Sequence, residues 1–112
     1  MRLANDIGKT RARDMILTGR RIDGDTAERW GLVSHSVQDA ETTALSLAMD
    51  LVKGAPLALH IAKVSLNVAK MLPYQDALIA ETLCYSSLLN TRDRREGLEA
   101  WSQRRLPNFV GN

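Results

Sequence analysis

The segment that decides the fold is MILTGRRIDGDTAERWGLV, residues 15–33, in which one helix ends and a short one follows. Gly19 comes after an apolar periodic run and favours a helix end, because glycine readily adopts the left-handed conformation. Asp23 and Asp25 are both good N-cap residues for the next helix. Gly31 ends that helix. This order of glycine and aspartate predicts two helices joined by a tight connection.

Periodic apolar residues predict further helices on both sides of that segment. The expected ranges are about 7–17, 40–53, 56–71 and 74–89, and a last helix that begins near residue 91. Pro73 separates the two longest ranges, so these are expected to form a helix hairpin. Residues 32–37 are expected to be extended and to form at most one short strand. The predicted fold class is therefore all-α, with five or six helices and a central helix hairpin.

The last predicted helix carries recognisable signals along its length. Thr91 or Asp93 can cap its N-terminus, and Asp93 with Glu96 three residues later fits a capping box. Leu98 and Trp101 are its expected apolar anchors.

A glycine inside this helix and an aromatic residue after it suggest a close contact. Gly97 costs about 1 kcal/mol relative to alanine in a helix interior. Its presence indicates the close approach of another backbone or of a ligand. Pro107 ends regular structure, and Phe109 is expected to fold the tail back.

Length and charge exclude several classes of protein. The chain has 112 residues, which suits a single helical domain over residues 1–112. Its net charge of +2 is too small to predict nucleic-acid binding. No stretch of about 18 apolar residues is present, so no membrane-spanning helix is expected. The N-terminus lacks a signal-peptide core, so we expect a cytoplasmic protein, or one of the mitochondrial matrix if it is eukaryotic and processed.

Metal sites and activated nucleophiles are not expected. Cys84 is the single cysteine, which excludes an internal disulfide and a cysteine-based zinc site. His35 and His60 have no further ligand at a suitable spacing, and zinc usually needs three or four. Ser34 and Ser36 flank His35, but adjacency in the chain does not place serine on histidine in catalytic geometry.

Residues 15–33 resemble a segment of the crotonase superfamily, the enoyl-CoA hydratases and isomerases, in which the pattern LTGR-I-A-A-GLV recurs. The pairs RL at residues 2–3 and IG at 7–8 match the lead-in to that segment. The run TRDRREGLEAWSQRRLPNF, residues 91–109, is similar to the family's C-terminal signature. The resemblance covers nearly the whole chain, but only the last part of a typical family member.

The resemblance implies chemistry on acyl-CoA thioesters. In the family, two backbone N–H groups hold the thioester oxygen as charge develops on it. Hydratases add two glutamates as general acid and base. These groups lie in the part that precedes the segment seen here, so no catalytic residue is expected in this chain. Glu96 and Glu99 share a helix face and are expected to form a solvated surface with nearby arginines, namely Arg92, Arg95 and Arg105.

Trp101 and Arg104 are the candidate binding residues. They are three residues apart, so both can face one ligand. By the resemblance, an aromatic residue at position 101 walls the acyl or pantetheine pocket, and a basic residue at 104, often lysine, meets the CoA phosphates. A guanidinium grips phosphate through two parallel hydrogen bonds, and indole supplies a flat apolar wall. The alternative is that Trp101 is a core anchor and Arg104 a surface charge.

Three hypotheses follow. In the first, the chain is the C-terminal module of an enoyl-CoA hydratase/isomerase-like protein, an oligomerisation and CoA-site lid element without turnover. It binds no covalent cofactor, and acyl-CoA is its ligand. By the resemblance it assembles as a trimer or hexamer. In the second, a separate N-terminal half completes a working enzyme. In the third, the chain is a non-catalytic helical adaptor that binds a protein partner.

Overall fold

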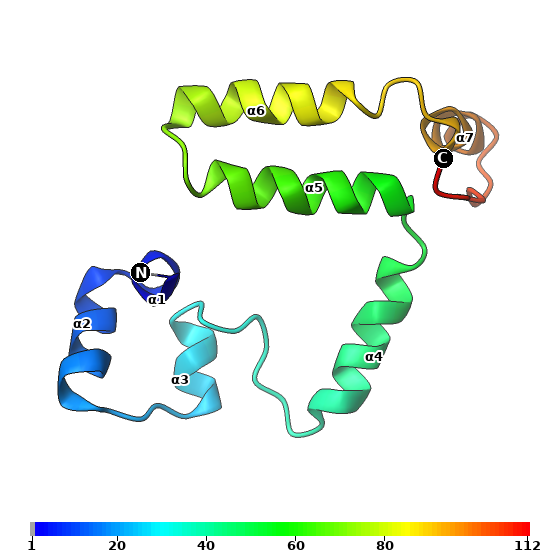
Figure 1. Ribbon diagram of the computed structural model, residues 1–112. Helices are drawn as coiled ribbons and strands as arrows, with labels where there is room; N and C mark the ends of the chain where they lie inside the picture. The colour runs from blue at the N-terminus through cyan, green and yellow to red at the C-terminus, as the bar shows by residue number, and fades with distance from the viewer. Residues whose placement is uncertain (1) are drawn as a thin grey trace. The chain divides into compact units, whose positions relative to one another are not determined.

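The computed structural model describes residues 2–112. The helices in that range are α1 (Arg2–Ile7), α2 (Lys9–Thr18), α3 (Gly24–Arg29), α4 (Ala40–Leu51), α5 (Pro56–Ala69), α6 (Tyr74–Ser86) and α7 (Arg92–Ser102) (Figure 1). The same residues contain no strand, and the all-α prediction is confirmed. The chain divides into two compact units, Met1–Ser46 and Leu47–Asn112. Each is described by itself, and a single domain over residues 1–112 stays a prediction.

The first unit has one more helix than the sequence predicts. Gly8 has a φ of +84°, which separates α1 from α2 where a single helix over residues 7–17 was expected. Seven helices therefore occur in the described range instead of five or six. The two short helices pack on each other, and Ile7 and Ala12 are buried between them.

The connection from α2 to α3 forms as the sequence predicts. Gly19 closes α2 in the left-handed conformation, with φ +65° and ψ +19°. Asp23 caps α3, because its carboxylate accepts a hydrogen bond of 2.9 Å from the backbone N–H of Thr26. The guanidinium of Arg11 lies over the ring of Trp30, 5.1 Å from its centre, and thereby links α2 to the end of α3.

Residues 32–37 form irregular backbone and not a strand. Two side chains of α3 accept hydrogen bonds from Ser36 in this segment. The N–H of Ser36 donates to Glu28, at 2.8 Å, and its hydroxyl donates to Asp25, at 2.9 Å. Asp25 is therefore a loop anchor, and Asp23 alone caps the helix.

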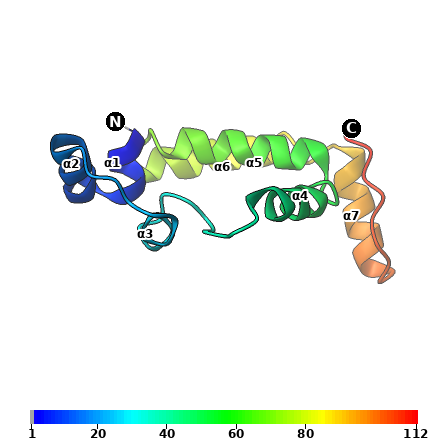
Figure 2. The same ribbon diagram turned by 90° about the horizontal axis from the view of Figure 1, so that it is seen from below.

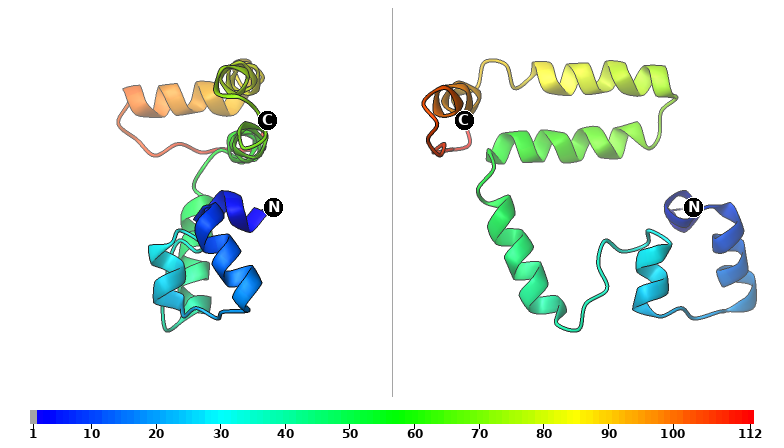
Figure 3. Two further views of the ribbon diagram at one scale, coloured as in Figure 1. Left: turned by 90° about the vertical axis from the view of Figure 1, so that its left-hand side faces the viewer. Right: turned by 180° about the vertical axis from the view of Figure 1, so that it is seen from behind.

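The second unit is built on the predicted hairpin. Pro56 occupies the first turn of α5, where its missing N–H costs nothing, and Pro73 immediately precedes α6. Helices α5 and α6 run in opposite directions and pack along their length. Figure 3 (left), which looks nearly along both axes, shows them side by side.

The tail after α7 runs back beside that helix, as Figure 2 shows. Asp93 is only 3% exposed, and its two carboxylate oxygens accept hydrogen bonds of 2.8 Å from the N–H groups of Val110 and Gly111. The Phe109 ring lies against Gly97, where an added Cβ would be 3.6 Å from a ring carbon. The expected close approach at Gly97 is therefore an aromatic side chain of the tail.

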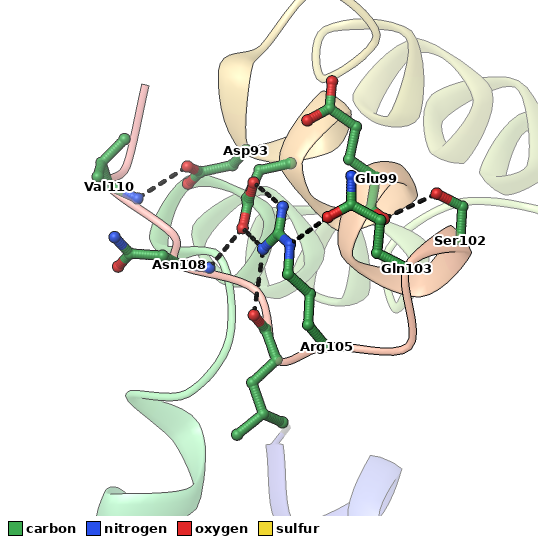
Figure 4. Close-up of polar contacts among 9 residues, drawn as sticks. Asp93, Glu99, Ser102, Gln103, Arg105, Asn108 and Val110 are labelled. Carbon is green, nitrogen blue, oxygen red and sulfur yellow. Dashed lines mark hydrogen bonds and ion pairs between the residues drawn. The ribbon is translucent and has the colours of Figure 1, made fainter.

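Glu96 is a second anchor for the tail. Its carboxylate accepts two hydrogen bonds from the Arg105 guanidinium, at 2.6 and 2.9 Å, and one from the N–H of Asn108, at 2.7 Å (Figure 4). The predicted capping box of Asp93 and Glu96 is therefore wrong. Thr91 caps α7 by accepting a hydrogen bond from the N–H of Arg94, which leaves both carboxylates for the tail.

Few apolar side chains are buried within the described residues. The buried ones are Ile7, Ala12, Ala27 and Ala100. Many large apolar side chains of α4, α5 and α6 are exposed. The predicted anchors of α7 are exposed as well, Leu98 to 56% and Trp101 to 83%. No single described helix is long and apolar enough to cross a membrane, although α4 and α5 together pass that test of length and composition as a bent pair.

Replacing Asp93 by alanine should destabilise the chain by about 2 kcal/mol, because the substitution leaves two partly buried N–H groups without an acceptor. Urea unfolding followed by far-ultraviolet circular dichroism measures this loss. Glu99→Ala is the matched control, since Glu99 is exposed on the same helix, and its effect should stay within about 0.5 kcal/mol. Equal losses in the two variants would contradict the anchoring role of Asp93.

The Glu96 contacts should make stability depend on acid pH. The hydrogen bonds from Arg105 and from the N–H of Asn108 lower the pKa of the Glu96 carboxyl from 4.5 to about 2. The folded pKa lies below the unfolded one, so the stabilisation is complete above pH 4.5 and is lost as the pH falls towards 2.

The measurement is the difference in unfolding free energy between the native chain and Glu96→Gln at a series of pH values. This difference isolates Glu96 from Asp23 and Asp39, whose pKa values are also lowered by hydrogen bonds from Thr26 and Thr42. The difference should shrink between pH 4.5 and 2. If the difference in unfolding free energy stays constant over that range, Glu96 does not make these contacts.

Candidate functional site

Trp101 and Arg104 lie together at the C-terminal end of α7. Both line an open groove of about 460 Å³, with Ala100, Ser102 and Arg105 as the other lining residues. The Trp101 side chain is 83% exposed, so it is not a core anchor within the described residues. The structure thus brings the two predicted binding residues onto one surface.

The helix end that carries Arg104 has an unusual residue at its turning point. The N–H of Arg104 donates to the carbonyl of Trp101, at 3.2 Å, and the N–H of Arg105 donates to the carbonyl of Ala100, at 3.0 Å. These two bonds form a Schellman motif, in which the turning residue is usually glycine. Here that residue is Arg104, with a φ of +53°. A left-handed arginine costs about 1–2 kcal/mol of backbone strain.

The two neighbouring arginines at this end differ in their partners. Arg105 donates to both carboxylate oxygens of Glu96, and these hydrogen bonds raise the pKa of its guanidinium. For Arg104, in contrast, no side-chain hydrogen bond or ion pair is found within residues 2–112. The groove therefore offers a flat indole surface beside a cation whose hydrogen-bond donors are available to a ligand.

The remaining polar candidates are dispersed in the described structure. His35 and His60 are both exposed. No three metal-ligating side chains gather at one place within residues 2–112. Cys84 is half-buried and lines an apolar groove of about 320 Å³ between α5 and α6, where Glu81 is the one acidic lining residue.

Sequence reasoning missed three features of the site. The expected solvated face of α7 is in part a polar groove of about 620 Å³ beside the tail, and Glu96 and Asn108 are among the residues that line it. The pairing of Glu96 with Arg105 was expected from charge alone, but its role in holding the tail was not. The left-handed conformation of Arg104 had no sequence signal, because that position normally selects glycine.

Comparison with known proteins identifies relatives over the whole chain. The family model described as enoyl-CoA hydratase/isomerase matches residues 1–112. The mitochondrial enoyl-CoA hydratase domain-containing protein 2 of Bos taurus is 35% identical over 116 residues, which cover 98% of this chain and 39% of that protein. The mitochondrial methylglutaconyl-CoA hydratase of Mus musculus is 33% identical, over 98% of this chain and 37% of its own length.

Comparison with solved structures finds proteins of the same kind. The crystal structure of enoyl-CoA hydratase from Bacillus anthracis superposes with a TM-score of 0.93 at 32% identity, and the match covers 100% of this chain and 44% of that one. The chain spans about two fifths of the length of the curated relatives that it matches. Its helices correspond to the C-terminal helical part of the crotonase fold. On the full-length match of the family model and this structural likeness, the chain belongs to the enoyl-CoA hydratase/isomerase family.

Proposed function

We propose that this chain supplies the C-terminal wall of an acyl-CoA site, with Trp101 and Arg104 as the residues that contact the CoA moiety. The observation that carries the proposal is the groove at the end of α7, in which an exposed indole lies beside a guanidinium that has no side-chain partner within residues 2–112. The relatives are named for reactions of enoyl-CoA and methylglutaconyl-CoA, which are both CoA thioesters.

The chemistry of the groove suits CoA. Its phosphate groups are the natural partners of an arginine fork, which donates two parallel hydrogen bonds. The indole face of Trp101 offers an apolar wall for the acyl or pantetheine portion. Strain at Arg104 supports a role for its side chain, because glycine would close the same turn without that cost.

The chain by itself acts as a lid and oligomerisation element without turnover. By the family resemblance, the oxyanion donors and catalytic glutamates belong to the part that precedes residues 2–112. Exposed apolar side chains on α5 and α6 support assembly, either as a homotrimer or hexamer or with a separate N-terminal half. The proposed location is the cytoplasm, or the mitochondrial matrix; the Bos taurus and Mus musculus relatives are named as mitochondrial proteins.

Calorimetric titration with crotonyl-CoA tests the binding proposal. Saturable binding is expected, and Arg104→Ala should weaken it by about tenfold or more, since a charge-assisted hydrogen bond to phosphate is lost. Trp101→Ala should weaken it by several-fold through loss of the apolar wall.

Two controls sharpen this test. Arg13→Ala removes the same charge from α2, outside the groove, and should leave affinity unchanged. A crotonyl-pantetheine thioester, which lacks the phosphates, should bind equally to the native chain and to Arg104→Ala. Absence of binding to crotonyl-CoA, or equal effects of the two arginine variants, would refute the proposal and favour the adaptor hypothesis.

Self-association is the expected consequence of the exposed apolar surface. Leu66 is 68% exposed and lines two adjoining grooves between α5 and α6. Light scattering at micromolar concentration should show oligomers, and Leu66→Glu should shift the population towards monomer. Asn67→Glu adds the same charge to α5 at a residue that lines neither groove, and should leave the mass unchanged. A monomeric native chain would contradict assembly through this surface.

A further inference from the structure

The left-handed backbone at Arg104 is held by contacts of its neighbours. Its own side chain makes no hydrogen bond or ion pair within the described residues, so no side-chain contact of residue 104 offsets the strain at φ +53°. A strained conformation of this kind persists only where the surrounding structure over-determines it. The residues on either side of Arg104 are therefore the ones that hold the turn.

The guanidinium of Arg105 connects the two sides of that turn. Its Nε donates to the side-chain oxygen of Gln103, at 2.8 Å, and its Nη1 donates to the carbonyl of Leu106, at 3.2 Å (Figure 4). Gln103 precedes Arg104 and Leu106 follows it. Gln103 and Leu106, on either side of Arg104, are therefore both hydrogen-bonded to the Arg105 guanidinium.

Glu96, a residue of α7, binds the Arg105 guanidinium and so connects it to the helix. Its carboxylate pairs with both terminal nitrogens of Arg105 and also accepts from the N–H of Asn108, at 2.7 Å. The side chains of this ion pair are 22% and 39% exposed, so solvent only partly screens them. The path of the chain after Arg104 is thereby directed back along the helix, which requires the left-handed turn.

We infer that Glu96 is a positioning residue, which acts through Arg105 to hold Arg104 in the left-handed turn and so to present its guanidinium beside Trp101. This inference rests on the proposed function for the role of Arg104 towards CoA. The backbone part of the inference is independent of any ligand. Without the contact, residue 104 can relax to an ordinary conformation and turn its side chain away from the groove.

Amide hydrogen exchange measured by NMR tests the backbone part without ligand. The N–H of Arg105 closes the Schellman motif, so its exchange reports the left-handed turn. Glu96→Gln should accelerate exchange at Arg105 by about tenfold, the factor that corresponds to the cost of a left-handed non-glycine residue. Asp93→Asn is the matched control, because Asp93 holds the tail at Val110 and Gly111 but does not contact Arg105.

A second substitution distinguishes two roles of Glu96, positioning of Arg104 and simple attachment of the tail. Glycine adopts the left-handed conformation without strain. In the background of Arg104→Gly, Glu96→Gln should therefore change exchange at Arg105 by less than about threefold. If Glu96 only fastens the tail, the acceleration will be the same in both backgrounds, and the inference is overturned. Arg105→Lys, which loses the fork while keeping the charge, should reproduce the effect of Glu96→Gln.

Affinity for crotonyl-CoA then tests the consequence for the site. Glu96→Gln should weaken binding by several-fold, and Asp93→Asn should leave it within about twofold. Equal weakening in both variants would overturn the inference. If the native chain does not bind crotonyl-CoA, the proposed function fails, and the exchange experiment still decides whether Glu96 holds the turn. Amides in the middle of α5 serve as the reference for global unfolding.

Discussion

The ion pair between Glu96 and Arg105 determines how the chain leaves α7, and the candidate site depends on that exit. Together with Asp93, the glutamate accepts backbone N–H groups of a tail that forms neither helix nor strand. Backbone donors near a protein surface must find some acceptor, and here carboxylates on one helix supply it. Phe109 then covers Gly97, which explains why a glycine is tolerated inside a helix.

Few apolar side chains are buried in the described structure, and this bears on how the chain functions. Within residues 2–112 most of the buried apolar side chains are alanines, while large side chains of the hairpin remain at the surface. Such a chain is well suited to contact further protein, whether a second copy or another part of a hydratase. The chain matches about two fifths of the length of its longer relatives. An acyl-CoA site assembled from several segments would give α7 the role of one wall.

Sequence patterns predicted much of the fold. The left-handed Gly19, the cap at Asp23 and the hairpin around Pro73 were all expected and are present. The break at Gly8 was not expected, because the apolar periodicity predicted one helix over residues 7–17. Within residues 2–112 no strand lies beside the segment 32–37, and side chains of α3 accept the hydrogen bonds of Ser36 instead.

By itself, the sequence determined every described helix except α1, most of the helix ends, the family and the choice of the two candidate binding residues. The helices and their ends depend on side chains within about four residues of each other. The family and the candidate residues follow from short sequence motifs. Tertiary structure alone decided that Asp93 and Glu96 bind the tail instead of capping their own helix, and that Arg104 adopts a left-handed turn. Those outcomes depend on backbone groups 12 to 18 residues further along the chain, whose return to α7 no local pattern encodes.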